Sequence, residues 1–117
     1  MFGFEKLEVW QLAIEYSDNV YATTRSFPID ERFGLTNQVR RASVSVSSNI
    51  AEGSGRSSRK DFARFVEIAF GSLLETISQF TIAKRQGFLE QTDFDRLYVT
   101  AERLGRMLSG LKNSLES

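Results

Sequence analysis

The stretch RRASVSVSSNIAEGSGRSSRKDF, residues 40–62, determines the fold, and it can be interpreted in two ways. Serine and valine alternate over residues 43–47, which is typical of a half-buried strand, and the glycine-rich run 53–58 could lead into a helix. A strand, a glycine loop and a helix in this order begin many phosphate-binding sites. In the other interpretation residues 40–51 form a helix and the glycines follow it, which favours a helical bundle without chemistry.

The rest of the chain favours the helix, because three other segments carry apolar residues at helical spacing. The three stripes are Leu7, Trp10, Ala13, Ile14, Ser17, Val20, Tyr21 and Thr24; Phe62, Phe65, Val66, Ala69, Leu73, Ile77 and Phe80; and Leu97, Ala101, Leu104, Leu108, Leu111 and Leu115. A single strand among long helices would have no partner, since a phosphate-binding sheet needs several strands.

Helical spacing also fits the ambiguous stretch itself. Val39, Ala42, Val46 and Ile50 follow one another at intervals of three, four and four, which makes one apolar face. The glycine run lacks the lysine and the spacing of a nucleotide-binding P-loop. We therefore predict a helix over residues 35–52, with Gly53 and Gly55 ending the helix and reversing the chain.

The ends of the other helices follow from local signals. The first helix should end before Phe27-Pro28, because proline disfavours helix in the residue before it, and residues 28–34 should form a loop. A helix over residues 58–86 would be capped by Ser58 with Asp61 and closed by Gly87. Thr92 with Asp95 has the pattern of a capping box and predicts a last helix over residues 92–115.

Four amphipathic helices with short connections predict an all-α, up-down-up-down antiparallel four-helix bundle. The chain has no internal repeat, linker or low-complexity segment, so residues 1–117 should form one domain.

Composition excludes several kinds of chemistry. The chain has no cysteine and no histidine, so it has no disulfide, no thiol nucleophile and none of the commonest metal ligands. We expect no catalytic residue, metal, cofactor or small-molecule substrate. The first ten residues, MFGFEKLEVW, do not resemble a signal peptide, and no apolar stretch is long enough to span a membrane. The expected location is the cytoplasm.

The net charge is zero, but the charges are unevenly distributed. Residues 1–31 carry −4, residues 32–60 carry +5 and residues 61–117 carry −1. This asymmetry is compatible with an anionic partner, and equally with helices that pair through opposite charges.

A second, polar stripe accompanies the apolar one in residues 35–52 and has a counterpart in the next helix. Its members are Gln38, Arg41, Ser45, Asn49 and Glu52, with Ser72, Glu75 and Gln79 on the next helix. An antiparallel register would pair Arg41 with Glu75 and Ser45 with Ser72. We interpret this stripe as a structural polar network that fixes helix register or a subunit interface, and alternatively as a polar ligand site.

The same residues resemble a known family. The segment NQVRRASVSVSSNIAEGSGRSSRKDFARFVEIAFGSLLET is similar to the core signature of four-helix bundle proteins encoded by intervening sequences of bacterial large-subunit ribosomal RNA genes. The flanking segments FEKLEVWQLAIEYSDNVYATTRSFP, RFGLTNQ and RMLSGLKNSL are similar too, so the resemblance covers nearly the whole chain. It implies a four-helix bundle that assembles as a homopentamer, without known catalysis. Related accessory proteins of diversity-generating retroelements bind nucleic acid and a reverse transcriptase, but they are strongly basic.

Three functional hypotheses follow. The leading one is a non-enzymatic, self-assembling interaction scaffold in which Trp10, Phe70 and Tyr98 seal subunit contacts. The second is an accessory protein that binds RNA or DNA weakly. Its possible contact residues are Arg40, Arg56, Arg59 and Lys60, with Lys84, Arg85, Arg96, Arg103 and Arg106 as the alternative surface. The third is an enzyme that would depend on the carboxylates Glu52, Glu67 and Glu75.

Overall fold

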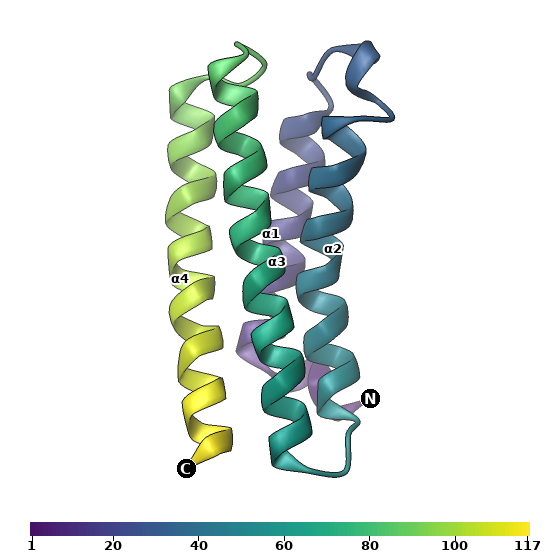
Figure 1. Ribbon diagram of the computed structural model, residues 1–117, viewed down its shortest axis with the longest axis vertical. Helices are drawn as coiled ribbons and strands as arrows, with labels where there is room; N and C mark the ends of the chain where they lie inside the picture. Colours follow the sequence, from purple (N-terminus) through teal and green to yellow (C-terminus); the bar gives the residue numbers. More distant parts are fainter.

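The computed structural model describes residues 1–117 and contains four α-helices, two short 3-10 turns and no strand (Figure 1). The elements are the turn η1 (Gly3–Lys6), α1 (Glu8–Thr24), the turn η2 (Ile29–Glu31), α2 (Leu35–Ser54), α3 (Arg59–Arg85) and α4 (Gln91–Glu116). The predicted all-α class with four helices is confirmed, and the loop expected over residues 28–34 contains the turn η2.

Helix α2 resolves the ambiguity of residues 40–62. Val39, Val46 and Ile50 are fully buried, whereas Val44 points to solvent, as helical spacing requires. The hydroxyl groups of the two buried serines donate hydrogen bonds to backbone carbonyls of the same helix. Ser43 Oγ donates to the carbonyl of Arg40 at 2.8 Å, and Ser47 Oγ donates to that of Val44 at 3.1 Å. The serine–valine alternation is therefore a local coincidence, not a strand.

The signals for α3 are confirmed at both ends. The side chain of Ser58 accepts the backbone N–H of Asp61 at 3.0 Å, which caps the first turn. Gly87 follows the helix with φ of +81°, a left-handed conformation that glycine adopts without strain. The N–H of Phe88 then reaches back to the carbonyl of Ala83 at 2.9 Å, as in a Schellman motif.

Two sequence predictions about helix ends are wrong. Helix α4 begins at Gln91 with Glu90 as its N-cap, so Thr92 already lies inside the first turn and cannot form a capping box. Asp95 instead accepts a hydrogen bond from the side chain of Gln91 at 2.7 Å. Gly53 does not end α2, because the helix continues to Ser54 and Gly55 is the C-cap.

Gly53 has a packing role instead. It is buried, and a Cβ atom placed on it would lie 2.6 Å from Cβ of Phe65 and 2.9 Å from the ring of Phe62. Those distances are far inside ordinary van der Waals contact. The missing side chain therefore allows α2 and α3 to approach closely just before the chain reverses.

The helices form a bundle of 43 × 23 × 22 Å in which successive helices run in opposite directions (Figure 1). Helix α1 contacts α2 and α4, and helix α3 contacts the same two helices, so α1 and α3 lie diagonally across the bundle. A single cluster of buried apolar side chains from all four helices fills the centre. This arrangement is consistent with the antiparallel bundle that the short connections predict.

One hydrogen bond spans the α1–α3 diagonal inside the core. The hydroxyl of Tyr16 lies 2.7 Å from Oγ1 of Thr76, and both residues are fully buried. Thr76 Oγ1 also donates to the carbonyl of Leu73. Burial raises the pKa of Tyr16 to about 12, because it penalises the phenolate more than the hydrogen bond with Thr76 favours it.

Candidate interaction surface

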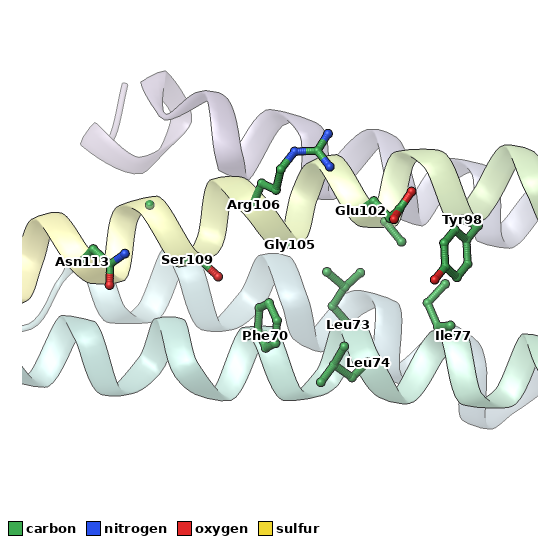
Figure 2. A pocket seen from close by; sticks show the side chains of 12 residues that line it. Phe70, Leu73, Leu74, Ile77, Tyr98, Glu102, Gly105, Arg106, Ser109 and Asn113 are labelled. Atoms are coloured by element: carbon green, nitrogen blue, oxygen red, sulfur yellow. The ribbon is translucent and has the colours of Figure 1, made fainter.

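An apolar groove runs along the outside of the bundle between α3 and α4 (Figure 2). Its volume is about 590 Å³. Phe70, Leu73 and Ile77 extend from α3 toward α4, and the ring of Tyr98 extends from α4 toward Ile77 (Figure 2). Leu74 also lines the groove from α3. The groove is larger than the two next hollows, of about 480 and 490 Å³, so it is the first candidate for a functional surface.

The groove exists because large residues on one helix face small residues on the other. Gly105, Ser109 and Gly110 line its α4 side. A Cβ atom on Gly105 would lie 3.5 Å from the ring of Phe70, so the two helices are close together at the floor of the groove. Leu74 is left 55% exposed and Tyr98 42% exposed, although both belong to long helices in a packed bundle. These side chains remain available to a partner.

Two charged residues stand at the α4 edge of the groove. Glu102 and Arg106 are both exposed, and neither forms an ion pair within the chain. In Figure 2 both side chains rise from α4 away from α3. A partner in the groove would therefore meet an apolar floor with one free cation and one free anion on the same rim.

The predicted polar network lies on the outer edge of the α2–α3 seam rather than inside the bundle. Gln38, Arg41, Glu52 and Glu75 are all exposed. The expected ion pair between Arg41 and Glu75 is absent, and Glu75 accepts a hydrogen bond from the Gln79 side chain at 3.1 Å. Water solvates both charges at this edge, so there is no desolvated pair to stabilise or destabilise the fold.

The middle of the stripe does form a network. Oγ of Ser45 and Oγ of Ser72 lie 2.9 Å apart, which joins α2 to α3 in the predicted register. The amide of Asn49 donates to Oγ of Ser45 at 2.9 Å and to the Ser45 carbonyl at 2.8 Å. These three half-buried residues form a structural link between two helices.

Most of the predicted nucleic-acid contacts are engaged inside the chain. Arg40 donates to Oγ1 of Thr24 at 2.8 Å and stacks on the ring of Tyr21 at 4.7 Å. Arg59 donates to the backbone carbonyls of Ser114 and Leu115, the last turn of α4. A cation there is favourable because helix C-termini carry partial negative charge.

The other two basic residues differ from each other. Arg56 pairs with Glu52 at 2.8 Å and approaches Asp61 at 3.8 Å, while its guanidinium lies 4.6 Å from the centre of the Phe65 ring. Lys60 is exposed and has no hydrogen bond or ion pair. Lys60 is therefore the one member of this set that the fold does not use.

The carboxylates of the enzyme hypothesis are scattered. Glu52 pairs with Arg56, Glu67 lies 3.8 Å from Nζ of Lys112, and Glu75 faces Gln79. All three are exposed, and no group of three acidic residues in the structure could hold a metal ion. They do not converge on one cavity.

Sequence reasoning identified Phe70 and Tyr98 as surplus aromatics but missed the groove between them. Leu74 stands one position after the core residue Leu73, so the pair suggests only a wide apolar face. Gly105 interrupts the α4 stripe between Leu104 and Arg106 without any turn signal. A glycine inside a strongly periodic helix was the available clue, because it usually has a packing or functional reason.

Comparison with known proteins agrees with the fold. A family model described as "23S rRNA-intervening sequence protein" matches residues 5–110. Among solved structures, the chain resembles a protein with unknown function from the S23 ribosomal protein family of Bacteroides thetaiotaomicron, with a TM-score of 0.83. The two sequences are 18% identical, and the match covers 90% of this chain and 95% of the other, so it speaks to the fold alone. No curated protein matches the chain.

Proposed function

We propose, from the premise that the chain belongs to the 23S rRNA-intervening sequence protein family, that it assembles with copies of itself into a non-enzymatic interaction scaffold. The assembly we propose is a homopentamer, the state that the sequence resemblance implies. We place it in the cytoplasm.

The observation that carries this proposal is the uncovered apolar groove between α3 and α4. Only four of the 26 residues of α4 are buried, although its apolar stripe continues to Leu115. Half-exposed leucine and tyrosine side chains that gather in one groove are typical of a subunit surface.

Helix α3 supports the same proposal. Contrary to the expectation from the sequence that no apolar stretch could span a membrane, this helix is long and apolar enough to do so by length and composition alone, with a mean hydropathy of 1.2 over 18 residues. In the bundle its apolar residues serve two sides, since one set faces the core and Phe70, Leu74 and Ile77 line the groove. A covered groove accounts for this composition within a soluble assembly.

The nucleic-acid alternative has weaker support. Three of its four proposed contacts are held by Thr24, Glu52 and the end of α4, which leaves Lys60 free. Salt-dependent RNA or DNA binding needs several cations that can release counterions from phosphates, and within this set of four only Lys60 is free of contacts with the chain.

The test is the mass of the purified protein in solution. Light scattering coupled to size exclusion, repeated over a range of micromolar concentrations, should give one species of about five times 13.3 kDa. A monomer mass at every concentration would overturn the proposal. A titration with structured RNA at low salt belongs beside it, because tight binding that falls steeply with salt would favour the accessory role instead.

A further inference from the structure

The side of the bundle opposite the groove carries a second apolar surface. Helices α1 and α3 are diagonal, so the α1–α2 side and the α3–α4 side face away from each other. In Figure 1, α4 lies on the left, α3 in the middle and α2 on the right, and α1 lies behind them. The two surfaces therefore belong to opposite faces of one molecule.

We define the α1–α2 strip as Trp10, Ile14, Tyr21 and Val44. Tyr21 lies toward α2, because the guanidinium of Arg40 stacks on its ring. Ile14 is two turns before Tyr21, and Val44 is one turn after Arg40, so each shares a face with its neighbour. The exposed fractions of Ile14, Tyr21 and Val44 are 37%, 39% and 41%, and Trp10 is half-buried against the ring of Phe4 at 5.1 Å.

The two halves of the chain carry opposite net charges. Residues 1–54, which include α1 and α2, have seven acidic and five basic side chains, a net charge of −2. Residues 55–117, which include α3 and α4, have eight acidic and ten basic side chains, a net charge of +2. Locally, Asp18 is exposed without an ion pair beside the strip, whereas Glu102 and Arg106 are both exposed without one at the groove. The opposite net charges of the two halves favour contacts between unlike halves of two copies over contacts between like halves.

We propose that the α3–α4 groove binds the α1–α2 strip of a second copy of this chain. The inference rests on the proposed self-assembly and specifies its interface. The contact is heterologous, because each copy offers its groove to one neighbour and its strip to another, and such contacts close into rings when the rotation between copies allows it.

The dimensions are sufficient for such an interface. One long side of the 43 × 23 × 22 Å bundle measures about 950 Å², somewhat more than the roughly 800 Å² that each partner buries in an interface of standard size. An isologous dimer through the groove would bring the two positively charged halves of the chains together and leave the strip uncovered. The heterologous contact covers both apolar surfaces with one geometry.

Two single variants test the geometry. Leu74→Glu places an acid in the groove, where it would face the acidic side of a neighbour, and Ile14→Lys places a base on the strip, where it would face the basic side. We expect each variant alone to be monomeric by sedimentation velocity. Mixed in equal amounts, they should form a complex of two chains and nothing larger, because only one intact groove and one intact strip remain.

The control variant is Ile82→Lys. It changes a 49%-exposed residue of α3 outside the groove and should keep the parental mass. Circular dichroism and thermal melts of each variant verify the fold. If Ile14→Lys alone keeps the parental mass, or if the mixture gives no dimer, the strip-to-groove contact is wrong while self-assembly stands. A monomeric parent would overturn self-assembly itself.

A second measurement avoids disruptive charges. Because the chain has no cysteine, a single one can be introduced without background. A short bismaleimide should link a Val44→Cys copy to a Tyr98→Cys copy in a mixture, and neither variant to itself. Linkage within either variant alone would contradict the heterologous contact.

Discussion

Replacing Gly53 with alanine tests the closest approach in the bundle. The new Cβ would lie 2.6 Å from Cβ of Phe65, and carbon atoms in contact normally stay about 3.5–4.0 Å apart. Cβ of Phe65 is fixed to the backbone, so no rotamer change relieves the clash and α2 must move away from α3 by about 1 Å. Overpacking of this kind costs about 1–3 kcal/mol, partly offset by about 1 kcal/mol of helix propensity.

We therefore expect Gly53→Ala to lower the free energy of unfolding by up to about 2 kcal/mol in urea melts followed by circular dichroism at one fixed protein concentration. Gly71→Ala is the matched control, because nothing lies within 4 Å of the position a Cβ would take there. That variant should be up to about 1 kcal/mol more stable than the parent. The reasoning is refuted if both variants have the same stability.

Three further predictions concern single side chains. The pKa of Tyr16 is raised from 10.0 to about 12, so its contribution is complete below pH 10 and is lost between pH 10 and 12, where the unfolded chain ionises first. Relative to Tyr16→Phe, the parent should lose about 1.4 kcal/mol between pH 9 and pH 11 in urea melts, and parallel pH curves would contradict this. Glu75→Ala should change stability by less than about 0.5 kcal/mol, because Glu75 is exposed and unpaired with Arg41; a loss above about 2 kcal/mol would restore the buried pair. Gly87→Ala forces a side chain into φ of +81° and should lower the free energy of unfolding by about 1 kcal/mol in the same assay. Its control is Gly110→Ala, made in the monomeric Ile14→Lys variant, for which we expect no loss because a Cβ there meets nothing within 4 Å.

The spacing of apolar residues was sufficient to predict the helices, but not to predict what each helix face contacts. The spacing of Val39, Val46 and Ile50 identifies a buried face, because a helix can bury only one side. The stripe through Arg41 and Ser45 has the same spacing, yet periodicity does not tell whether such a face meets another helix or the solvent beside it. Ser45 reaches Ser72, whereas Arg41, just over one turn earlier, is already exposed.

Glycines were the residues most difficult to interpret from sequence. Gly53 precedes a true turn, so the sequence suggests a helix end, and only the position of Phe65 in space shows a packing role. Gly105 has no flanking turn residues, and its effect depends on the large side chains that α3 places opposite it. Both depend on the distance between helices, which is a property of the pair and not of either segment.

The hydrogen bond between Tyr16 and Thr76 has a consequence for how uniquely the chain folds. Apolar stripes that repeat every three or four residues can slide past one another by one helical turn, about 5.4 Å, and still bury carbon against carbon. A bond of 2.7 Å between two fully buried hydroxyls does not survive that displacement. A slipped bundle would strand the tyrosine hydroxyl among aliphatic side chains, at a cost of about 1–3 kcal/mol. The hydrogen bond between Tyr16 and Thr76 therefore favours one register of α1 against α3 over the neighbouring registers.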